Sequence, residues 1–176
     1  MDIRIATLRD LADVLAFYHQ VSDAMIGTHD DCCWRRDGHP SPEFLESLVR
    51  DEGMIVAIEG DHIVAAVGVD HDLGHDYGAL AWLADVSPDE VCVVHLLATL
   101  PQERGRGIAH KLLQACYDLA RERGMRSVRL DATANNSQAI ALYEGEGFQT
   151  VGTGYQFTGV GEDPNTKFFV MELLLV

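Results

Sequence analysis

The sequence predicts a single domain of the mixed α/β class that spans residues 1–176. Short apolar runs with strand character alternate with amphipathic stretches of helical period, in the order β-α-α-β-β-β-α-β-α-β-β. The chain is 47% hydrophobic and 23% charged, so it has enough apolar material for a core. Its length of 176 residues is that of one ordinary domain.

The first half of the chain predicts two helices followed by a β-hairpin. Thr7 and Asp10 have the spacing of a capping box before the first helix, and Ser41 is a suitable cap for the second. Gly60 and Asp61, between two apolar runs, predict a tight turn. The expected elements are a strand at 3–6, a helix over 8–26, a long loop over 27–40, a helix from 42 to 49, and strands at 54–59 and 62–69.

The second half predicts a central strand, two helices and three further strands. Residues 70–88 have no clear period, and we interpret them as an insertion with a short helix or strand near 79–83. Continuous apolar character over 91–98 is typical of the centre of a sheet. The remaining expected elements are a helix over 108–123, a strand ending at 131, a helix over 136–144, a strand beginning at 148 and a strand over 167–174.

The charge of the chain excludes two classes of partner. The sequence holds 13 Lys and Arg and 28 Asp and Glu, a formal net charge of −15. We expect no nucleic-acid partner and no membrane, because neutralising phosphates needs clustered Lys and Arg. The acidity is concentrated: residues 1–90 hold 19 acidic and 5 basic side chains, and residues 91–176 hold 9 and 8.

Apolar runs and cysteines predict a cytoplasmic protein. No window approaches the roughly 18 apolar residues of a spanning helix, and no apolar run follows a basic stretch at the start of the chain. The four cysteines have no CxxC spacing, and Cys92 and Cys116 lie in apolar periodic stretches that are typical of a core. We therefore expect reduced thiols.

One segment between the central strand and the long helix carries chemistry. In residues 102–109 (QERGRGIA), Gly105 and Gly107 let the backbone turn tightly and approach a ligand. The helix that follows presents unpaired N–H groups and a positive dipole end, which suit a pyrophosphate. Arg104 and Arg106 add cations that suit phosphate. Taken alone, such a segment is explained equally well as a simple turn.

Two motifs resemble those of the GCN5-related N-acetyltransferase superfamily. The segment 97–109 resembles that family's motif A, Q/R-x-x-G-x-G/A, with Gln102, Gly105 and Gly107 in place. The segment 136–148 (NSQAIALYEGEGF) resembles its second signature, N-x-x-A-x-x-L-Y-x-x-x-G-F. The predicted order of elements also agrees. The resemblance implies a central mixed, mostly antiparallel sheet flanked by helices and splayed at the strand 91–98.

The resemblance implies an acetyl-CoA-dependent N-acetyltransferase, which moves an acetyl group to a primary amine of a small molecule or peptide by direct attack in a ternary complex. The pyrophosphate would lie on backbone N–H groups of residues 104–109. A backbone N–H near Leu97 would polarise the thioester carbonyl. No metal is implied. The cofactor-binding residues implied by the resemblance are Leu97, Ala98, Thr99, Gln102, Arg104, Gly105, Arg106, Gly107, Ile108, Ala109, Asn136 and Tyr143.

Two side chains match catalytic positions of the family. Tyr143 matches the acid that protonates the leaving thiolate, and it is alternatively a packing residue of its helix. His95 stands where many relatives carry Glu; imidazole exchanges its proton near neutral pH, yet a buried strand His explains it equally well. Glu90 or Asp131 acting through a water is a further option. Asn136 matches a cofactor contact and equally suits a helix N-cap.

The first half is expected to supply the acceptor side and the second half the cofactor side. Trp34 and the pair Asp30 and Asp31 are candidates for acceptor contact. The acidity of residues 1–90 suits a cationic acceptor such as an amino sugar, a polyamine or a peptide N-terminus. It is also an ordinary device for solubility.

Other interpretations remain open. A non-catalytic acyl-CoA-binding sensor on the same fold would need neither His95 nor Tyr143, and another acyl donor is a further alternative. Many relatives dimerise through their C-terminal strands, so a homodimer is compatible with the sequence. The His and Asp residues of 70–76 are metal-ligand types, but a polar, turn-rich loop favours solvation over metal binding.

Overall fold

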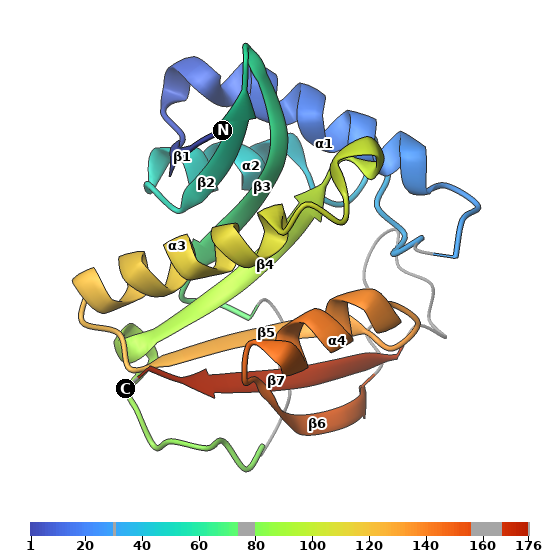
Figure 1. Cartoon of the computed structure of the whole chain (residues 1–176). Coiled ribbons are helices and arrows are strands. Elements are labelled where there is room, and N and C mark those ends of the chain that lie inside the picture. The colour runs from blue at the N-terminus through green and yellow to red at the C-terminus, as the bar shows by residue number, and fades with distance from the viewer. Residues whose placement is uncertain (30, 74–79, 156–166, 176) are drawn as a thin grey trace.

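The computed structural model describes residues 1–29, 31–73, 80–155 and 167–175, and one seven-stranded sheet forms its centre (Figure 1). The strand order is β1-β2-β3-β4-β5-β7-β6, and every neighbouring pair is antiparallel except β4 and β5. The strands are β1 (Asp2–Ile5), β2 (Met54–Glu59), β3 (His62–Asp70), β4 (Val91–Thr99), β5 (Ser127–Thr133), β6 (Gln149–Tyr155) and β7 (Phe168–Leu174). The helices are α1 (Leu11–Met25), α2 (Pro42–Arg50), α3 (Ile108–Glu122) and α4 (Ser137–Gly145).

The observed order of strands and α-helices is the predicted one, so the mixed, mostly antiparallel class is confirmed. Short 3-10 turns precede α1, β4 and α3, at η1 (Leu8–Asp10), η2 (Pro88–Glu90) and η3 (Pro101–Glu103). At η1 the predicted capping box is present, because the Asp10 carboxylate accepts from the Thr7 backbone N–H at 2.8 Å.

The short helix or strand expected near 79–83 is wrong for residues 80–83, which form neither; residue 79 lies outside the described residues. Side chains of the sheet hold this segment instead of a backbone ladder. The Arg129 guanidinium lies 3.8 Å from the ring centroid of Trp82, and the Leu83 N–H donates to the Glu172 carboxylate. Its backbone groups therefore find partners without regular secondary structure.

Two apolar layers cover the sheet, one on each face. Helices α3 and α4 pack on one face, and α1 and α2 pack on the other (Figure 1). Alternate residues of β2 point to opposite layers: Ile55 and Ala57 join the α3 side, whereas Met54 and Val56 join the α1 side. Because both faces are buried, β2 is a continuous apolar run without polar alternation.

The central pair of strands is splayed, as the family resemblance implies. β4 pairs with β5 only at residues 91–93, whereas its pairing with β3 continues to Thr99. Beyond Val93 the two parallel strands separate (Figure 1). The β5-facing edge of residues 94–99 therefore has no strand partner within the described part of the chain.

A β-bulge lies in β4 at the start of this open edge. Ala66 pairs with Ala98 and Gly68 with His95, so β4 holds one residue more than β3 over this stretch. Leu96 has a φ of +58°, a backbone conformation that L-residues adopt only at a cost of about 1–2 kcal/mol. The buried Tyr18 hydroxyl of α1 donates to the Leu96 carbonyl at 2.9 Å, which stabilises the bulge.

The described cysteines are free thiols, and Cys92 and Cys116 are buried in the core, as predicted. No helix within the described residues is both long enough and apolar enough to cross a bilayer.

Candidate active site

A first cavity of about 330 Å³ lies between the end of β4, the turn after η3 and the N-terminal ends of α3 and α4. Most of the predicted cofactor-binding residues line it. They are Leu97, Ala98, Thr99, Arg104, Gly105, Gly107, Ile108, Ala109, Asn136 and Tyr143. Gln102 and Arg106 are not among its lining residues.

The turn before α3 needs its two glycines. Gly105 has a φ of +76° and Gly107 a φ of +72°, both in the left-handed region that strains other residues. Gly107 is the N-cap of α3, so the first N–H groups of that helix have no partner one turn earlier. A Cβ at either glycine would meet nothing within 4 Å, and Gly107, Ile108 and Ala109 line the first cavity, so the start of α3 borders open space. Such a helix start binds anionic groups.

The two arginines of the turn differ in their surroundings. Arg104 lines the first cavity. The Arg106 guanidinium pairs with Glu59 at 2.8 Å and with Glu103, and hydrogen bonds with these two carboxylates raise the pKa of Arg106. Because its charge is already matched, Arg106 holds β2 against the turn rather than facing the first cavity.

The strand edge of β4 forms another wall of the same cavity. Residues 97–99 line it; Ala98 and Thr99 pair with β3, and none of the three pairs with β5. Their other edge offers backbone donors and acceptors to an extended ligand. The bulge at Leu96 shifts the alternation of this edge, so the N–H of Leu97 follows directly after a residue in the left-handed conformation.

A second cavity of about 430 Å³ adjoins the first at Leu97 of β4. The loop after α1, the start of α2 and parts of β3, β4, β5 and β7 enclose it. Six residues line both cavities: Cys32, Trp34, Leu97, Asn136, Ala139 and Tyr143. The molecule therefore has two chambers with a shared wall, which allows two ligands to meet there.

Tyr143 and Asn136 come from α4 to this shared wall. Tyr143 is 7% exposed, and its ring packs against Phe148 at 5.7 Å between centroids. Burial, with a smaller contribution from the Asp131 carboxylate, raises the pKa of Tyr143, so its phenol stays protonated and able to donate. The Asn136 side chain accepts from the Ala139 N–H at 3.1 Å, which confirms its predicted role as a helix N-cap.

His95 faces the second cavity and is held from two sides. Its Nε2 lies 2.8 Å from Asp70 Oδ1, and its ring meets the Phe44 ring edge-on at 5.6 Å. The Asp72 backbone N–H also donates to Asp70 Oδ1, at 2.8 Å, which fixes the carboxylate. With Asp70 accepting from Nε2–H, the lone pair of His95 lies on Nδ1.

Sequence reasoning missed Asp70 as a partner of His95. The two residues are 25 positions apart, and the antiparallel β3–β4 pairing, in which Gly68 pairs with His95 and Asp70 with Val93, brings them together. The sequence indicated Asp70 only as one of the possible metal ligands in the segment 70–76. The described residues contain no group of three potential metal ligands; His75 and Asp76 of that segment lie outside the described residues.

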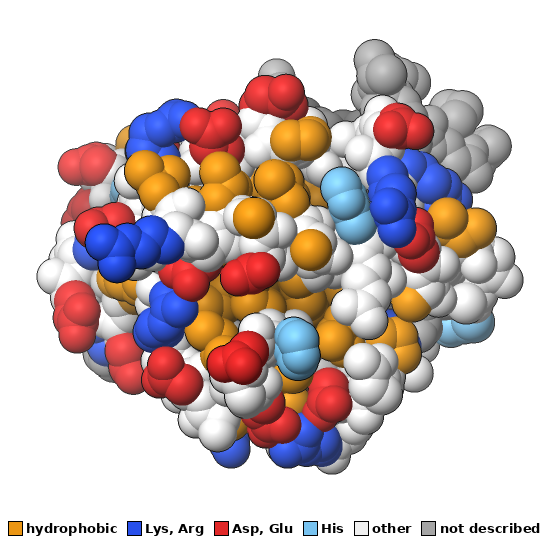
Figure 2. Space-filling view, turned by 90° about the horizontal axis from the view of Figure 1, so that it is seen from above, with side chains coloured by type: hydrophobic (Ala, Val, Ile, Leu, Met, Phe, Trp, Pro, Cys, Tyr) orange, Lys and Arg blue, Asp and Glu red, His pale blue; other side chains and the backbone are white. Residues whose placement is uncertain are grey.

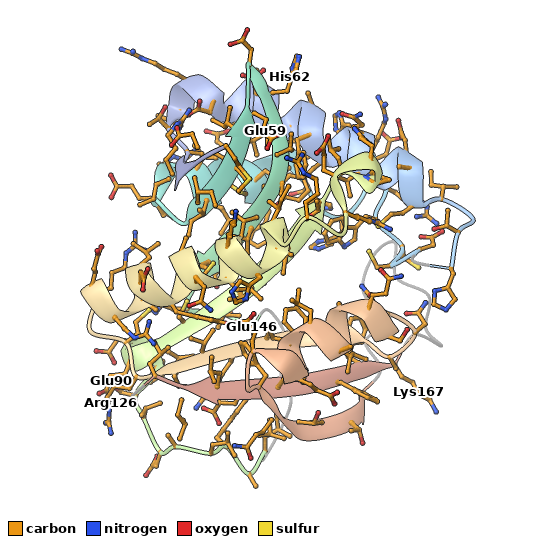
Figure 3. The ribbon with its side chains drawn as sticks, viewed as in Figure 1. Glu59, His62, Glu90, Arg126, Glu146 and Lys167 are labelled. Carbon is orange, nitrogen blue, oxygen red and sulfur yellow. The ribbon has the colours of Figure 1, made fainter. Side chains whose placement is uncertain are left out.

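The remaining candidates for acceptor contact and for the general base lie in different parts of the structure. Trp34 and Asp131 line the second cavity. Asp31 pairs with Arg35 at 2.9 Å and accepts from backbone N–H groups of its own loop, so it holds the loop; Asp30 lies outside the described residues. Glu90 bonds Ser87 and pairs with Arg126 at the start of β4, and neither cavity includes it (Figure 3).

Charges outside the cavities are mixed. Acidic side chains are spread over the face seen in Figure 2, with basic side chains between them. In the first half of the chain, arginines pair with nearby carboxylates, as Arg4 does with Asp10 at 2.7 Å. This hydrogen bond with Arg4 holds the pKa of Asp10 far below its usual range.

A glycine-rich turn at a helix start, beside a splayed strand and a second chamber, defines a two-substrate site of the acyltransferase type. Residues 15–148 match the model of the acetyltransferase (GNAT) family, so the chain belongs to that family. The chain is similar to N-alpha-acetyltransferase 30 of Schizosaccharomyces pombe, with 29% identity over 110 residues. That match covers 62% of this chain and 60% of the relative, less than two thirds of its length.

Solved structures share the fold along the whole chain. A ribosomal-protein-alanine N-acetyltransferase from Brucella melitensis has a TM-score of 0.71 at 24% identity, covering 99% of this chain and 100% of its own. A protein from Salmonella typhimurium, solved with its cofactor acetyl-CoA, has a TM-score of 0.70 at 18% identity, covering 100% of this chain and 94% of its own. At these identities the likeness defines the fold.

Proposed function

We propose that the protein transfers an acetyl group from acetyl-CoA to a primary amine of a small molecule or a peptide, by direct attack in a ternary complex. The observation that carries this proposal is the shared wall of the two cavities. The first cavity would hold acetyl-CoA, and the second would hold the amine. Within one domain, residues 91–176 mainly form the cofactor side, and residues 1–90 supply much of the acceptor side.

The residues of the first cavity fit acetyl-CoA. The open space before the N-terminus of α3 suits a pyrophosphate, and Arg104 adds a cation on the same wall. The unpaired edge of residues 97–99 suits the amide groups of a pantetheine arm. Acetyl-CoA supplies the activated acetyl group as a thioester, and the Leu97 N–H is the donor proposed for its carbonyl oxygen.

The chemistry divides into one substitution and two proton transfers. The amine nitrogen attacks the carbonyl carbon, a C–N bond forms, and the C–S bond breaks. His95 Nδ1 takes up the proton that the amine loses, while Asp70 orients the imidazole through Nε2–H. The Tyr143 hydroxyl donates to the departing thiolate, since its burial keeps it protonated.

The second candidate is a non-catalytic acyl-CoA-binding sensor on the same fold. It would use the glycine-rich turn but would need neither the His95–Asp70 pair nor Tyr143. The position of both groups on the wall of the second cavity, next to the first, favours transfer over sensing. Binding of acetyl-CoA without turnover of any amine would favour the sensor.

Calorimetry and a thiol-release assay test the proposal. Acetyl-CoA should bind to the wild type, and Gly107→Trp should abolish the binding by filling the open space before α3. Gly124→Trp is the matched control, because Gly124 has nearly the same positive φ, +75°, at the other end of α3. A panel of amines should release coenzyme A thiol. Undiminished binding by Gly107→Trp would contradict the assignment of the first cavity.

A further inference from the structure

We propose that the second cavity selects hydrophobic amines that carry no carboxylate next to the reacting nitrogen, and therefore rejects free amino acids. The assignment of the second cavity to the acceptor rests on the proposed function. The preference itself is a binding property, and it follows from the charges and rings of the cavity wall.

The Asp, Glu, Lys and Arg side chains in the described lining of the second cavity are all acidic. Asp70, Asp72 and Asp131 line it, together with the histidines His39 and His95, and its described lining contains no Lys or Arg. Positions 30, 74–79, 156–166 and 176, which the structure does not describe, contain no Lys or Arg in the sequence and one histidine, His75. An ammonium group entering this cavity would meet carboxylates, and a carboxylate would meet no fixed cation.

The Lys and Arg residues within two positions of this lining in the chain pair with other carboxylates or point away. Arg35 pairs with Asp31 at 2.9 Å, and the Arg36 Nε lies 2.9 Å from an Asp23 oxygen. Arg129 pairs with Glu172 at 3.0 Å. Lys167 directly precedes Phe168, which lines the cavity, but its side chain points outward from the sheet (Figure 3).

A row of four rings, those of Trp34, Phe44 and two histidines, lies along the wall. Trp34 lies 6.3 Å from His39, His39 lies 6.2 Å from Phe44, and Phe44 lies 5.6 Å from His95, measured between ring centroids. All four rings line the second cavity. An apolar group on the amine would pack along this row, and its nitrogen would then lie near His95.

The carboxylates of the wall set the discrimination. Asp70 is bonded to Nε2 of His95, so a nitrogen that gives its proton to Nδ1 lies across the imidazole ring from this carboxylate. A carboxylate on the carbon next to that nitrogen would lie in a cavity whose acidic lining residues are Asp70, Asp72 and Asp131, and like charges inside a cavity are poorly screened. An amide at the same position has no such penalty, so a peptide N-terminus and a simple amine are both admitted.

Three probes with the same ring test this inference: phenethylamine, phenylalaninamide and phenylalanine. We expect the first two to bind the protein saturated with coenzyme A, and to show kcat/KM values about 100-fold above that of phenylalanine, since like-charge contact opposes the carboxylate. Ethanolamine, which lacks the ring, should bind more weakly than phenethylamine. The ratio of the kcat/KM values for phenethylamine and phenylalaninamide shows whether a simple amine or a peptide N-terminus is the preferred acceptor.

Charge variants locate the cause. Asp131→Asn should raise kcat/KM for phenylalanine relative to phenethylamine by about tenfold, because one like charge is removed at constant volume. Asp118→Asn is the control, since Asp118 is 73% exposed on α3 and pairs with Arg121. It should leave the ratio unchanged.

Two readouts keep this inference separate from the proposed function. If calorimetry shows the amine preference but no amine is acetylated, the inference stands and the proposed function fails. If phenylalanine binds as tightly as phenethylamine, or if neither phenethylamine nor phenylalaninamide binds, the inference is overturned whether or not turnover occurs. An unchanged ratio in Asp131→Asn also overturns it.

Discussion

The two cavities share a wall but differ in how local their lining is. About half of the residues that line the first cavity lie in the single segment 97–109, which holds the edge of residues 97–99, two glycines and the start of α3. The second cavity is lined by short pieces of the loop after α1, α2, β3, β4, β5, α4 and β7. A site built from one segment depends on a short local sequence, whereas a site built from many elements depends on the whole topology. Changes to the acceptor therefore need not disturb the cofactor.

The largest expected effect lies on the shared wall, at Tyr143. Tyr143→Phe should lower kcat by about 10²–10⁴-fold, the range for loss of a general acid. The affinity for acetyl-CoA should change little, because the ring and its contact with Phe148 remain. Steady-state kinetics together with calorimetry separate the two quantities. An unchanged kcat would show that Tyr143 only packs in the walls of the two cavities and is not the acid.

Tyr117→Phe is the matched control for this substitution. Tyr117 is also a buried tyrosine beside Phe148, at 6.3 Å between ring centroids, but it lines neither cavity. Its hydroxyl is buried without a hydrogen-bond partner among the described residues. Because a buried unsatisfied hydroxyl is unfavourable, Tyr117→Phe should leave kcat unchanged and preserve or raise stability.

The next effect concerns the second cavity alone. His95→Gln should lower kcat by about 100-fold and remove the acidic limb of the pH–rate profile, because the variant has no titrating base there. Asp70→Asn keeps a hydrogen-bond acceptor for His95 but removes the charge, so it should lower kcat by less than His95→Gln does. Acetyl-CoA affinity should be unchanged in both variants. A wild-type pH profile in His95→Gln would remove His95 from the mechanism.

The fold was largely predictable, because its signals are local. Asp10 and Asn136 cap helices as their spacing indicates, and Gly60 takes the positive φ that a tight hairpin needs. The error near residue 80 has a distant cause. Trp82 is held by Arg129 and the Leu83 N–H by Glu172, residues 47 and 89 positions away, and no period in residues 80–83 reports such partners.

The parts of the candidate site that are built from neighbouring residues were predictable from the sequence, and the parts that are built from distant residues were not. The glycine-rich turn was found from consecutive residues. The bulge at Leu96 was not, since an ordinary leucine takes a positive φ there and is stabilised by Tyr18 of helix α1. The His95–Asp70 contact depends on the register of β3 against β4, and the row of rings depends on how the loop after α1 folds back.

The smallest expected effect tests that loop. Asp31 accepts from the backbone N–H groups of Gly27 and Cys33 and pairs with Arg35, and the adjacent residues Cys32 and Trp34 line both cavities. Asp31→Asn should lower the free energy of unfolding at pH 7 by less than about 1 kcal/mol, as for other partly exposed pairs. Because Cys32 and Trp34 line both cavities, it should raise KM for the amine and lower the affinity for acetyl-CoA, each severalfold.

The stability difference between the wild type and Asp31→Asn depends on pH, and the pKa of Asp31 sets the direction of that dependence. The hydrogen bond with Arg35 lowers the pKa of Asp31 to about 2, below the value of roughly 3.9 in an unfolded chain. The contribution of Asp31 is therefore complete above about pH 4 and is lost as the pH falls toward 2. Denaturant unfolding of wild type and Asp31→Asn should show a stability difference that shrinks over this range.

The matched control is Asp23→Asn, at the exposed pair with Arg36. If it raises KM for the amine as much as Asp31→Asn, general loosening of the loop explains the effect and the specific role of Asp31 is wrong.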